Sequence, residues 1–320
     1  MSSLGIDTSC YRTSVAYADD AGFAQRRQLL TVPQGKRGLQ QSELVFQHVQ
    51  NLPTLVEQLM DEASSAIDCV CVSTRPRPVD GSYMPVFTVG AGLGRSIAAM
   101  LRVPFYETTH QQCHLRAALV GSRMERGGFL ALHLSGGTSE LLLSDESLSV
   151  QRIGGTNDLN AGQLVDRVGV ALGAEFPAGP SLERMAQGFA PKAIIPTSIR
   201  ELACSFSGAE AQAMRMIESG NYAPGEVAVE VYSLIARTLA KLLSRASDEQ
   251  GISQALLFGG VASSALLRQM LADRMKKLRN DLIIHWADPA LSGDNAVGAA
   301  LIGHEMHASI KANNIRGNNT

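Results

Sequence analysis

The sequence has little of what marks a secreted, membrane-spanning or nucleic-acid-coating protein. Its five cysteines are odd in number and scattered, without a CxxC pair, so they do not suggest a disulfide framework. No uncharged apolar run reaches about 18 residues, and no basic and then apolar leader opens the chain, which argues against a membrane span and a signal peptide. The net charge of -2 gives no overall electrostatic attraction for nucleic acid. We therefore expect a cytoplasmic protein with reduced thiols.

Two histidines four residues apart form the most informative motif that is present. His110 and His114 follow Thr108 and Thr109, either of which could cap a helix, and an apolar stripe continues to Gly121. Side chains at this spacing leave the same face of a helix, which suits two ligands of one metal ion. Two polar helix positions without a metal would give the same pattern.

A third ligand candidate lies far along the chain, in a glycine-containing turn at residues 291–295. It is Asp294. Two neutral imidazoles and one carboxylate leave coordination positions open for a substrate oxygen, which is typical of a catalytic metal. A metalloprotease is not indicated, because Gln111 and Gln112 stand where a glutamate would act as the general base. The predicted metal ligands are His110, His114 and Asp294.

Three turns carry glycine or hydroxyl residues where strands are expected to end. The first hairpin has Asp7 and Ser9 at its tip, which we take as candidate catalytic residues at a phosphate or metal-water site, although turn chemistry alone explains many such tips. The strand over 129–134 runs into a Ser-Gly-Gly-Thr turn, and the strand over 256–258 runs into a Gly-Gly turn and a helix from about residue 265. Backbone amides at such turns can meet phosphate oxygens, whereas no Walker A or GxGxxG motif is present.

Three other segments have consequences for structure or function. Asp166 could hold a ribose hydroxyl, or it could be a surface carboxylate paired with Arg167 or Arg184. The Pro-rich loop Arg75–Tyr83 is either a solvated linker or a loop that faces an anion or RNA. The apolar pattern over residues 42–65 predicts an amphipathic helix that the proline at position 53 kinks or splits.

Taken together and in this order, these residues resemble the TsaD family of tRNA N6-adenosine threonylcarbamoyltransferases, over roughly residues 3–307. The resemblance implies an α/β fold of two ribonuclease-H-like domains, the actin-like ATPase fold, with an interdomain cleft. The expected halves are residues 1–107 with 295–320, and residues 108–294, the second half carrying the histidine helix and the nucleotide-binding turns.

The same resemblance implies the reaction and its participants. The family transfers a threonylcarbamoyl group from threonylcarbamoyl-adenylate to N6 of the adenosine next to the anticodon in tRNA. It uses one iron or zinc ion, here expected on the two histidines and the distal aspartate. The expected partners are the adenylate, tRNA and other proteins of the same pathway, and no membrane. The positions expected to bind substrate are Leu134, Ser135, Gly136, Gly137, Thr138, Asp166, Gly179, Glu183, Gly259, Gly260 and Ser264.

Several positions around the reacting group depart from the family pattern. Tyr11-Arg12-Thr13 stands where the family has Asp-Glu-Thr, and the Ser-Gly-Gly-Thr turn at 135–138 lacks the family's histidine. Ser264 and Ala265 replace Asn and Arg, and Arg75–Tyr83 replaces a Gly-Pro-Gly-rich loop. The pattern indicates a divergent paralogue. The alternatives are a nucleotide-binding paralogue without tRNA transferase activity, a carbamoyltransferase acting on a small molecule, or a structural subunit, which would have no chemical need of the three metal-ligand candidates.

Overall fold

The structure of the protein is a computed structural model that describes residues 1–9, 11–32, 39–63, 65–122, 124, 127–278 and 281–317, with the backbone only for 314–317. The chain forms two compact units, which we call unit 1 (Met1–Ala117 with Gly293–Thr320) and unit 2 (Ala118–Ser292). Within the described ranges, every helix is too short or too polar to cross a bilayer.

Unit 1 is built on a mixed sheet with strand order β3-β2-β1-β4-β5, in which β1, β2 and β3 are antiparallel and β4 and β5 run parallel to β1. Three long helices pack on it. The elements of unit 1 are β1 (Ser2–Asp7), β2 (Arg12–Asp19), β3 (Gly22–Leu29), α1 (Gln41–Met60), β4 (Cys69–Arg75), α2 (Phe87–Leu101), β5 (Phe105–Thr109), α3 (His110–Ala118) and α9 (Val297–Gly317).

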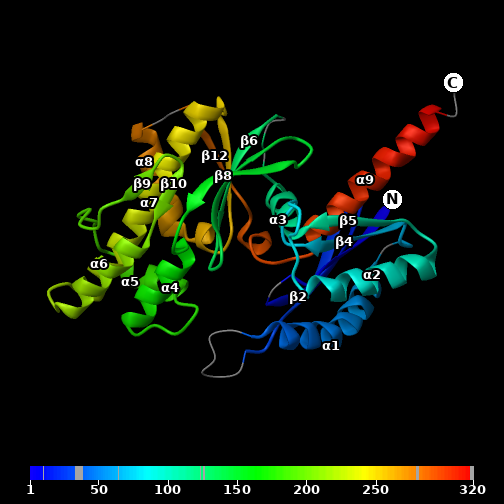
Figure 1. The fold of residues 1–320 in the computed structure, drawn as a ribbon, viewed down its shortest axis with the longest axis horizontal. Helices are drawn as coiled ribbons and strands as arrows, with labels where there is room; N and C mark the ends of the chain where they lie inside the picture. The colour runs from blue at the N-terminus through cyan, green and yellow to red at the C-terminus, as the bar shows by residue number, and fades with distance from the viewer. Residues whose placement is uncertain are drawn as a thin grey trace. The chain divides into compact units, whose positions relative to one another are not determined.

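The two faces of the unit 1 sheet are covered by different helices (Figure 1). Side chains alternate along a strand, so Leu4 and Ile6 of β1 face the apolar cluster that includes α1 and α2. Gly5 faces the opposite side, where a Cβ would lie 2.4 Å from the backbone nitrogen of Ala300 in α9. The glycine lets α9 pack directly against the strand, and this packing fixes the residues just before α9.

Unit 2 repeats the same arrangement of strands. Its sheet has the order β12-β11-β6-β7-β8-β10-β9, with β6, β7 and β8 antiparallel and β11 and β12 parallel to β6. The elements of unit 2 are β6 (Phe129–Leu134), β7 (Ser139–Ser144), β8 (Val150–Thr156), α4 (Ala161–Ala171), α5 (Gly179–Ala186), β9 (Ser198–Arg200), β10 (Ala203–Ser205), α6 (Ser207–Glu218), α7 (Pro224–Gln250), β11 (Gln254–Phe258), η1 (Val261–Ser263), α8 (Ala265–Leu278), β12 (Ile283–Trp286) and η2 (Pro289–Leu291).

The two sheets share one topology, because β6, β7, β8, β11 and β12 correspond in order and direction to β1, β2, β3, β4 and β5. The core of unit 2 lies between its sheet and α7, a helix buried on nearly every side from Gly225 to Ser247. The predicted pair of similar α/β halves is confirmed as a fold class.

Two details differ from the expectations. The sequence predicts that Pro53 kinks or splits its helix, and the structure has no split, because α1 runs through Pro53 as one helix from Gln41 to Met60. Its apolar stripe, including Leu52 and Leu55, packs on the sheet, and this packing outweighs the hydrogen bond that the proline removes. The contact units divide after Ala117 and before Gly293, so the histidine helix belongs with the first unit, whereas the predicted domain boundaries placed it in the second half.

The Asp158 carboxylate accepts hydrogen bonds from backbone N–H groups at the start of α6. Its contribution to stability should depend on pH. Burial alone would raise its pKa, but the hydroxyl of Ser207 and the backbone N–H groups of Phe206, Leu159 and Ser207 donate to the carboxylate and lower the pKa to about 2. Since the folded pKa lies below the unfolded value, this stabilisation is full above about pH 4 and is lost as the pH falls towards 2.

We expect Asp158→Ala to lower the free energy of unfolding at pH 7 by about 1 kcal/mol, a value reduced for solvent screening because the side chain is exposed. The difference between the variant and the parent should shrink as urea unfolding is repeated from pH 5 down to pH 3. Glu146→Ala, which removes another exposed acid, should change stability by less than about 0.5 kcal/mol. A difference for Asp158→Ala that stayed constant with pH would contradict this account.

Candidate metal centre and nucleotide-binding turns

The histidine helix begins where the local sequence predicts it. The last residue of β5, Thr109, caps α3, because its hydroxyl accepts from the backbone N–H of Gln112 at 3.2 Å while the amide oxygen of Gln112 accepts from the backbone N–H of Thr109 at 3.3 Å. This reciprocal pair is a capping box. A further bond from the backbone N–H of Gln111 to the carbonyl of Pro76, at 3.0 Å, holds the first turn. His110 is thereby fixed as the first residue of the helix.

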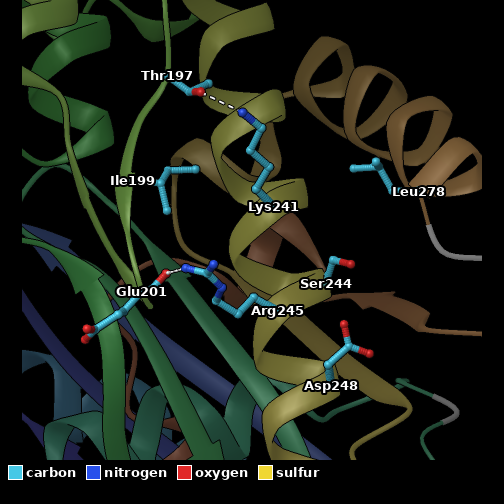
Figure 2. A pocket seen from close by; sticks show the side chains of 8 residues that line it. All are labelled: Thr197, Ile199, Glu201, Lys241, Ser244, Arg245, Asp248 and Leu278. Atoms are coloured by element: carbon cyan, nitrogen blue, oxygen red, sulfur yellow. Dashed lines mark hydrogen bonds between the residues drawn. The ribbon is translucent and has the colours of Figure 1, made fainter.

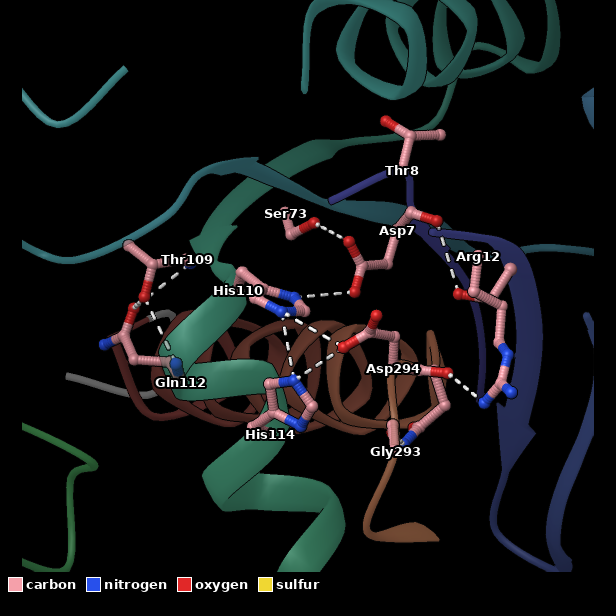
Figure 3. Close-up of polar contacts among 12 residues, drawn as sticks. Asp7, Thr8, Arg12, Ser73, Thr109, His110, Gln112, His114, Gly293 and Asp294 are labelled. Carbon is pink, nitrogen blue, oxygen red and sulfur yellow. Dashed lines mark hydrogen bonds and ion pairs between the residues drawn. The ribbon is translucent and has the colours of Figure 1, made fainter. Parts of the chain in front are cut away.

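The three predicted metal ligands lie together within unit 1 (Figure 3). The Nε2 atoms of His110 and His114 are 3.0 Å apart, and Asp294 Oδ1 lies 3.5 Å from the first and 3.1 Å from the second. Asp294 is brought there by the turn that leads into α9. Of the acids that the structure describes, it is the one that groups with both rings in a set that could hold a metal.

These distances suit a single divalent ion. Ligand atoms about 2.1 Å from a metal and separated by angles of 90–109° are about 3.0–3.4 Å from one another, which matches the separations of the three atoms. Two imidazoles and one carboxylate on one face of an ion are a donor set used for both iron(II) and zinc. The residues present therefore fit the metal that the resemblance implies.

Asp7 supports this site from behind. It is fully buried at the end of β1, where one carboxylate oxygen lies 2.9 Å from His110 Nδ1 and the other accepts from the hydroxyl of Ser73 at 2.8 Å. Burial alone would raise the pKa of Asp7, but the charge and hydrogen bond of His110 lower it. A carboxylate behind a ligating imidazole orients the ring and makes its other nitrogen more basic. Asp7 is thus placed to position His110, and contact with substrate is not indicated by its burial.

The same contacts determine how the ring is protonated when the metal is absent. Burial by itself would lower the pKa of His110, but the charges and hydrogen bonds of Asp7 and Asp294 raise it to about 10. The pKa of Asp294 is correspondingly held well below its usual value, despite its burial, by hydrogen bonds to the two histidines. Metal binding requires neutral imidazole, so a bound ion would take the place of a proton within this cluster.

We expect Asp7→Asn to weaken metal binding about 10–100-fold, because the amide keeps a hydrogen bond to Nδ1 but removes the negative charge behind the ring. Titration of the metal-free protein with zinc or iron(II) would measure it. Ser73→Ala is the matched control, because it removes only the hydrogen bond to Asp7 and should weaken binding less than tenfold. Equal affinities for Asp7→Asn and the parent protein would mean that Asp7 has no part in positioning the ligand.

Other residues near the ligands were not predicted, or lie differently from the prediction. The hydroxyl of Ser9, a candidate catalytic residue, is fully buried, so it does not form the open phosphate site expected of the hairpin tip. Ser73 and Phe87 were missed; the ring of Phe87 meets the His110 ring edge-on, with centroids 6.2 Å apart. Because β4 lies parallel to β1, the ends of these two strands lie at the same edge of the sheet. The position of Ser73 at the end of a buried strand could therefore have indicated that it lies near Asp7.

Arg12 reaches the backbone carbonyl of Asp294 at 3.5 Å, which places a cation beside the turn that carries Asp294.

The two glycine-containing turns of unit 2 lie side by side, at the carboxyl ends of the parallel neighbours β6 and β11. Gly259 has a φ of +102°, and a Cβ there would be 2.2 Å from the carbonyl oxygen of Leu134. Only glycine allows this approach. The structure therefore brings together the predicted residues Leu134, Ser135, Gly136, Gly137, Thr138, Gly259 and Gly260, at the edge of the sheet where ligands bind in open α/β folds.

The start of α4 packs against the turn at residues 135–138. The backbone N–H of Gly162 donates to the carbonyl of Ser135 at 3.3 Å, and a Cβ on Gly162 would lie 2.5 Å from that oxygen. We expect Gly162→Ala to displace the turn and to weaken binding of an adenine nucleotide at least tenfold by calorimetry. Gly208→Ala, at an open helix position, should leave the affinity within about twofold. Unchanged nucleotide affinity in Gly162→Ala would mean that the turn at residues 135–138 does not contribute to nucleotide binding.

Two of the remaining predicted substrate residues lie at the start of α8. Glu183 and Ser264 both accept from backbone N–H groups of its first turn, those of Leu266 at 2.7 Å and Leu267 at 3.2 Å. Both side chains therefore cap a helix. Tyr232, which the sequence did not single out, donates to the carbonyl of Gly179 at 3.1 Å.

Asp166 makes neither of the arginine pairs considered for it. Its carboxylate accepts from the backbone N–H of Ala178 at 2.8 Å, while Arg167 pairs with Glu210 and Arg184 donates to Ser181. Burial raises the pKa of Asp166, although the N–H groups of the 178–179 turn lower it in part. Asp166 thus stabilises the backbone turn at residues 178–179, which includes Gly179.

A hollow of about 400 Å³ lies elsewhere on unit 2, between β9 and α7 (Figure 2). Its cations are engaged within it, since Lys241 donates to Thr197 and Arg245 to the carbonyl of Glu201. Asp248 and Glu201 balance their charge. Neither the candidate metal ligands nor the residues of the 135–138 and 259–260 turns line this hollow.

Comparison with known proteins agrees with these features. Residues 37–301 match the family model of TsaD, described as tRNA N6-adenosine threonylcarbamoyltransferase. Enzymes of that name from Prochlorococcus marinus subsp. pastoris and Synechococcus sp. are 28% and 30% identical to the chain, over 93% and 80% of its length and 89% and 75% of their own. A full-length HypF structure in its phosphate- and nucleotide-bound form is similar in fold, with a TM-score of 0.61 and 13% identity; the match covers 95% of this chain and 46% of HypF.

The structural likeness supports the actin-like fold class, and the family match covers most of the sequence, including the histidine helix, Asp294 and both glycine turns. The chain belongs to the tRNA N6-adenosine threonylcarbamoyltransferase family.

Proposed function

We propose that this protein transfers a threonylcarbamoyl group from threonylcarbamoyl-adenylate to N6 of adenosine in tRNA, with one iron or zinc ion held by His110, His114 and Asp294. The observation that carries the proposal is the convergence of these three ligand atoms within 4.8 Å of one another, in a chain of this family. A bound divalent ion would supply Lewis-acid polarisation of the carbonyl and neutralise charge that develops on its oxygen.

The other steps are assigned to the chain's own groups. Asp7 keeps the proton on Nδ1 of His110, so that Nε2 remains available as a ligand. In unit 2, the backbone amides of the 135–138 and 259–260 turns bind the phosphate of the adenylate. The attacking N6 nitrogen forms a bond to the carbamoyl carbon, and the bond from that carbon to the phosphate oxygen breaks. AMP leaves with the electron pair, and the proton released by N6 passes to the AMP phosphate or to solvent water. Holding the donor in one orientation lowers the entropic part of the barrier.

The test combines metal analysis of the purified protein with an assay for transfer from threonylcarbamoyl-adenylate to unmodified tRNA. The proposal expects about one metal ion per chain and a product in which the label moves from the adenylate to tRNA. A protein that holds the metal and binds AMP, but modifies no tRNA in the presence of its pathway partners, would contradict the proposed acceptor.

A carbamoyltransferase with a small-molecule acceptor is the second candidate, and Arg12 is the observation that favours it. Its guanidinium lies beside the turn that carries Asp294, at a position where the family resemblance implies an acid. A cation there suits an acceptor amine whose molecule also bears a carboxylate. Incubation of the protein with threonylcarbamoyl-adenylate and amino acids would reveal this activity as a carbamoylated product that Arg12→Ala no longer forms.

A further inference from the structure

The loop between β4 and α2 is tied at its start to the two neighbours of His110 in the chain, and at its end to His110 itself. At its start, Arg75 pairs with Thr109 across β4 and β5, and the carbonyl of Pro76 accepts from the backbone N–H of Gln111 at 3.0 Å. At its end, the buried ring of Phe87 packs edge-on against His110. The position of the loop relative to the candidate metal ligands is therefore set by contacts on both sides of His110.

The loop is also ordered within itself. The hydroxyl of Ser82 accepts from the backbone N–H of Arg77 at 3.0 Å, and the backbone N–H of Ser82 donates to the carbonyl of Val79 at 3.2 Å. Pro76 and Pro78 restrict the backbone on either side of Arg77. Because the backbone is already confined, less conformational entropy is lost when the loop binds a partner.

The side chains at the surface of the loop combine positive charge with an aromatic ring. Arg75 and Arg77 are exposed, and Tyr83 is 66% exposed. With the exposed acid Asp80, the segment carries a charge of +1 in a chain whose total is -2. Arginines bind RNA phosphates, and an exposed aromatic ring stacks on a base that is unstacked in a single-stranded loop. The loop has both kinds of group within nine residues.

We propose that the Arg75–Tyr83 loop is an RNA-contacting surface of unit 1, in which Arg75 and Arg77 bind phosphates of a single-stranded RNA loop and Tyr83 stacks on an unpaired base. This inference rests on the proposed transfer to tRNA, and it adds the residues that hold the acceptor at the metal-bearing unit.

Fluorescence anisotropy with the full-length protein and a labelled, unmodified tRNA, measured from 50 to 300 mM KCl, tests the proposal. Arg75→Ala/Arg77→Ala should lose two phosphate contacts. The slope of log affinity against log salt concentration should therefore become less steep by about 1.5, and the affinity at 100 mM salt should fall about 10–100-fold. Tyr83→Ala should lower the affinity about tenfold without a change in slope, and Tyr83→Phe should bind as the parent does.

The matched control is Lys276→Ala/Lys277→Ala, which removes two exposed positive charges from α8 and should leave the affinity within about threefold. Metal content and thermal unfolding of the loop variants should equal those of the parent, which excludes a general loss of structure. If the parent protein binds tRNA and the arginine variant binds it with the same affinity and salt slope, or if the lysine control loses as much, the loop assignment is wrong while the proposed function stands. A parent protein that binds no tRNA at all would overturn the proposed acceptor itself.

Discussion

Replacing His110 with alanine is expected to remove the metal and at least 10³-fold of the transfer rate, which corresponds to about 4 kcal/mol of transition-state stabilisation. The ring supplies one of three converging ligand atoms, and its loss leaves one imidazole and one carboxylate, a pair that holds a divalent ion much less tightly. His114→Ala should behave in the same way, because its Nε2 lies 3.0 Å from that of His110. Metal content by mass spectrometry and the initial rate of transfer to tRNA measure the two effects together.

The matched control is His304→Ala. His304 is also a histidine of unit 1, but it lies on α9 and pairs with Asp20 at 3.0 Å. Its replacement should leave both the metal content and the rate within about twofold. A His110→Ala protein that folds, contains no metal and transfers the group at the parent rate would disprove a metal-dependent reaction, whereas a His304→Ala protein with equally low metal content would show that the losses come from general damage to unit 1.

Gly298→Ala is expected to be among the most destabilising single-methyl changes in unit 1. A Cβ at this position would lie 1.9 Å from the carbonyl oxygen of Cys113, and both partners are backbone in helices that cannot turn away. Gly298 is four residues after Asp294, and Cys113 lies between the two histidines. The added methyl must separate α9 from α3 at the place where the ligands meet. We expect a loss of about 3 kcal/mol in the free energy of unfolding, a fall of roughly 5–10 °C in Tm and a lower metal occupancy.

Gly92→Ala is the control with the same chemical change. Gly92 is an exposed position in α2 where a Cβ would have no atom within 4 Å. Because alanine has the higher helix propensity, this variant should be more stable by about 0.5–1 kcal/mol. Chemical denaturation of both variants gives the comparison. Equal stabilities would mean that α3 and α9 can move apart without cost, and that the close backbone contact does not fix the ligand geometry.

Much of the fold and of the candidate metal site could be predicted from local sequence. The helix period places His110 and His114, four residues apart, on the same face of α3. Thr109 and Gln112 mark where that helix begins. A short continuous run of apolar residues identifies buried strands such as Cys69–Arg75. A Gly-Gly pair after β11 marks a turn before a helix. These signals lie within a few residues of the feature that they predict, because helix period, capping and turn conformation are properties of short segments.

The assignments that needed the tertiary structure concern residues whose partners are remote in the chain. Asp294 meets His114 across 180 positions, and the sequence could nominate it only from its residue type and its turn. Asp7 was predicted to be catalytic, but the parallel pairing of β1 with β4 and the start of α3 place it behind His110. Glu183 and Ser264 were expected at the adenylate, and they cap α8.

The sequence by itself determined helices such as α3 and α8, strands such as β6 and β11, the glycine turns and the membership of the family, since each depends on short segments or on residues in a recognisable order. The tertiary structure alone decided which side chains meet. A hydrogen bond or a ligand set requires atoms to come within about 3 Å, and that accuracy comes from strand register and from close contacts such as Gly298 on Cys113. No local pattern in the chain encodes those distances.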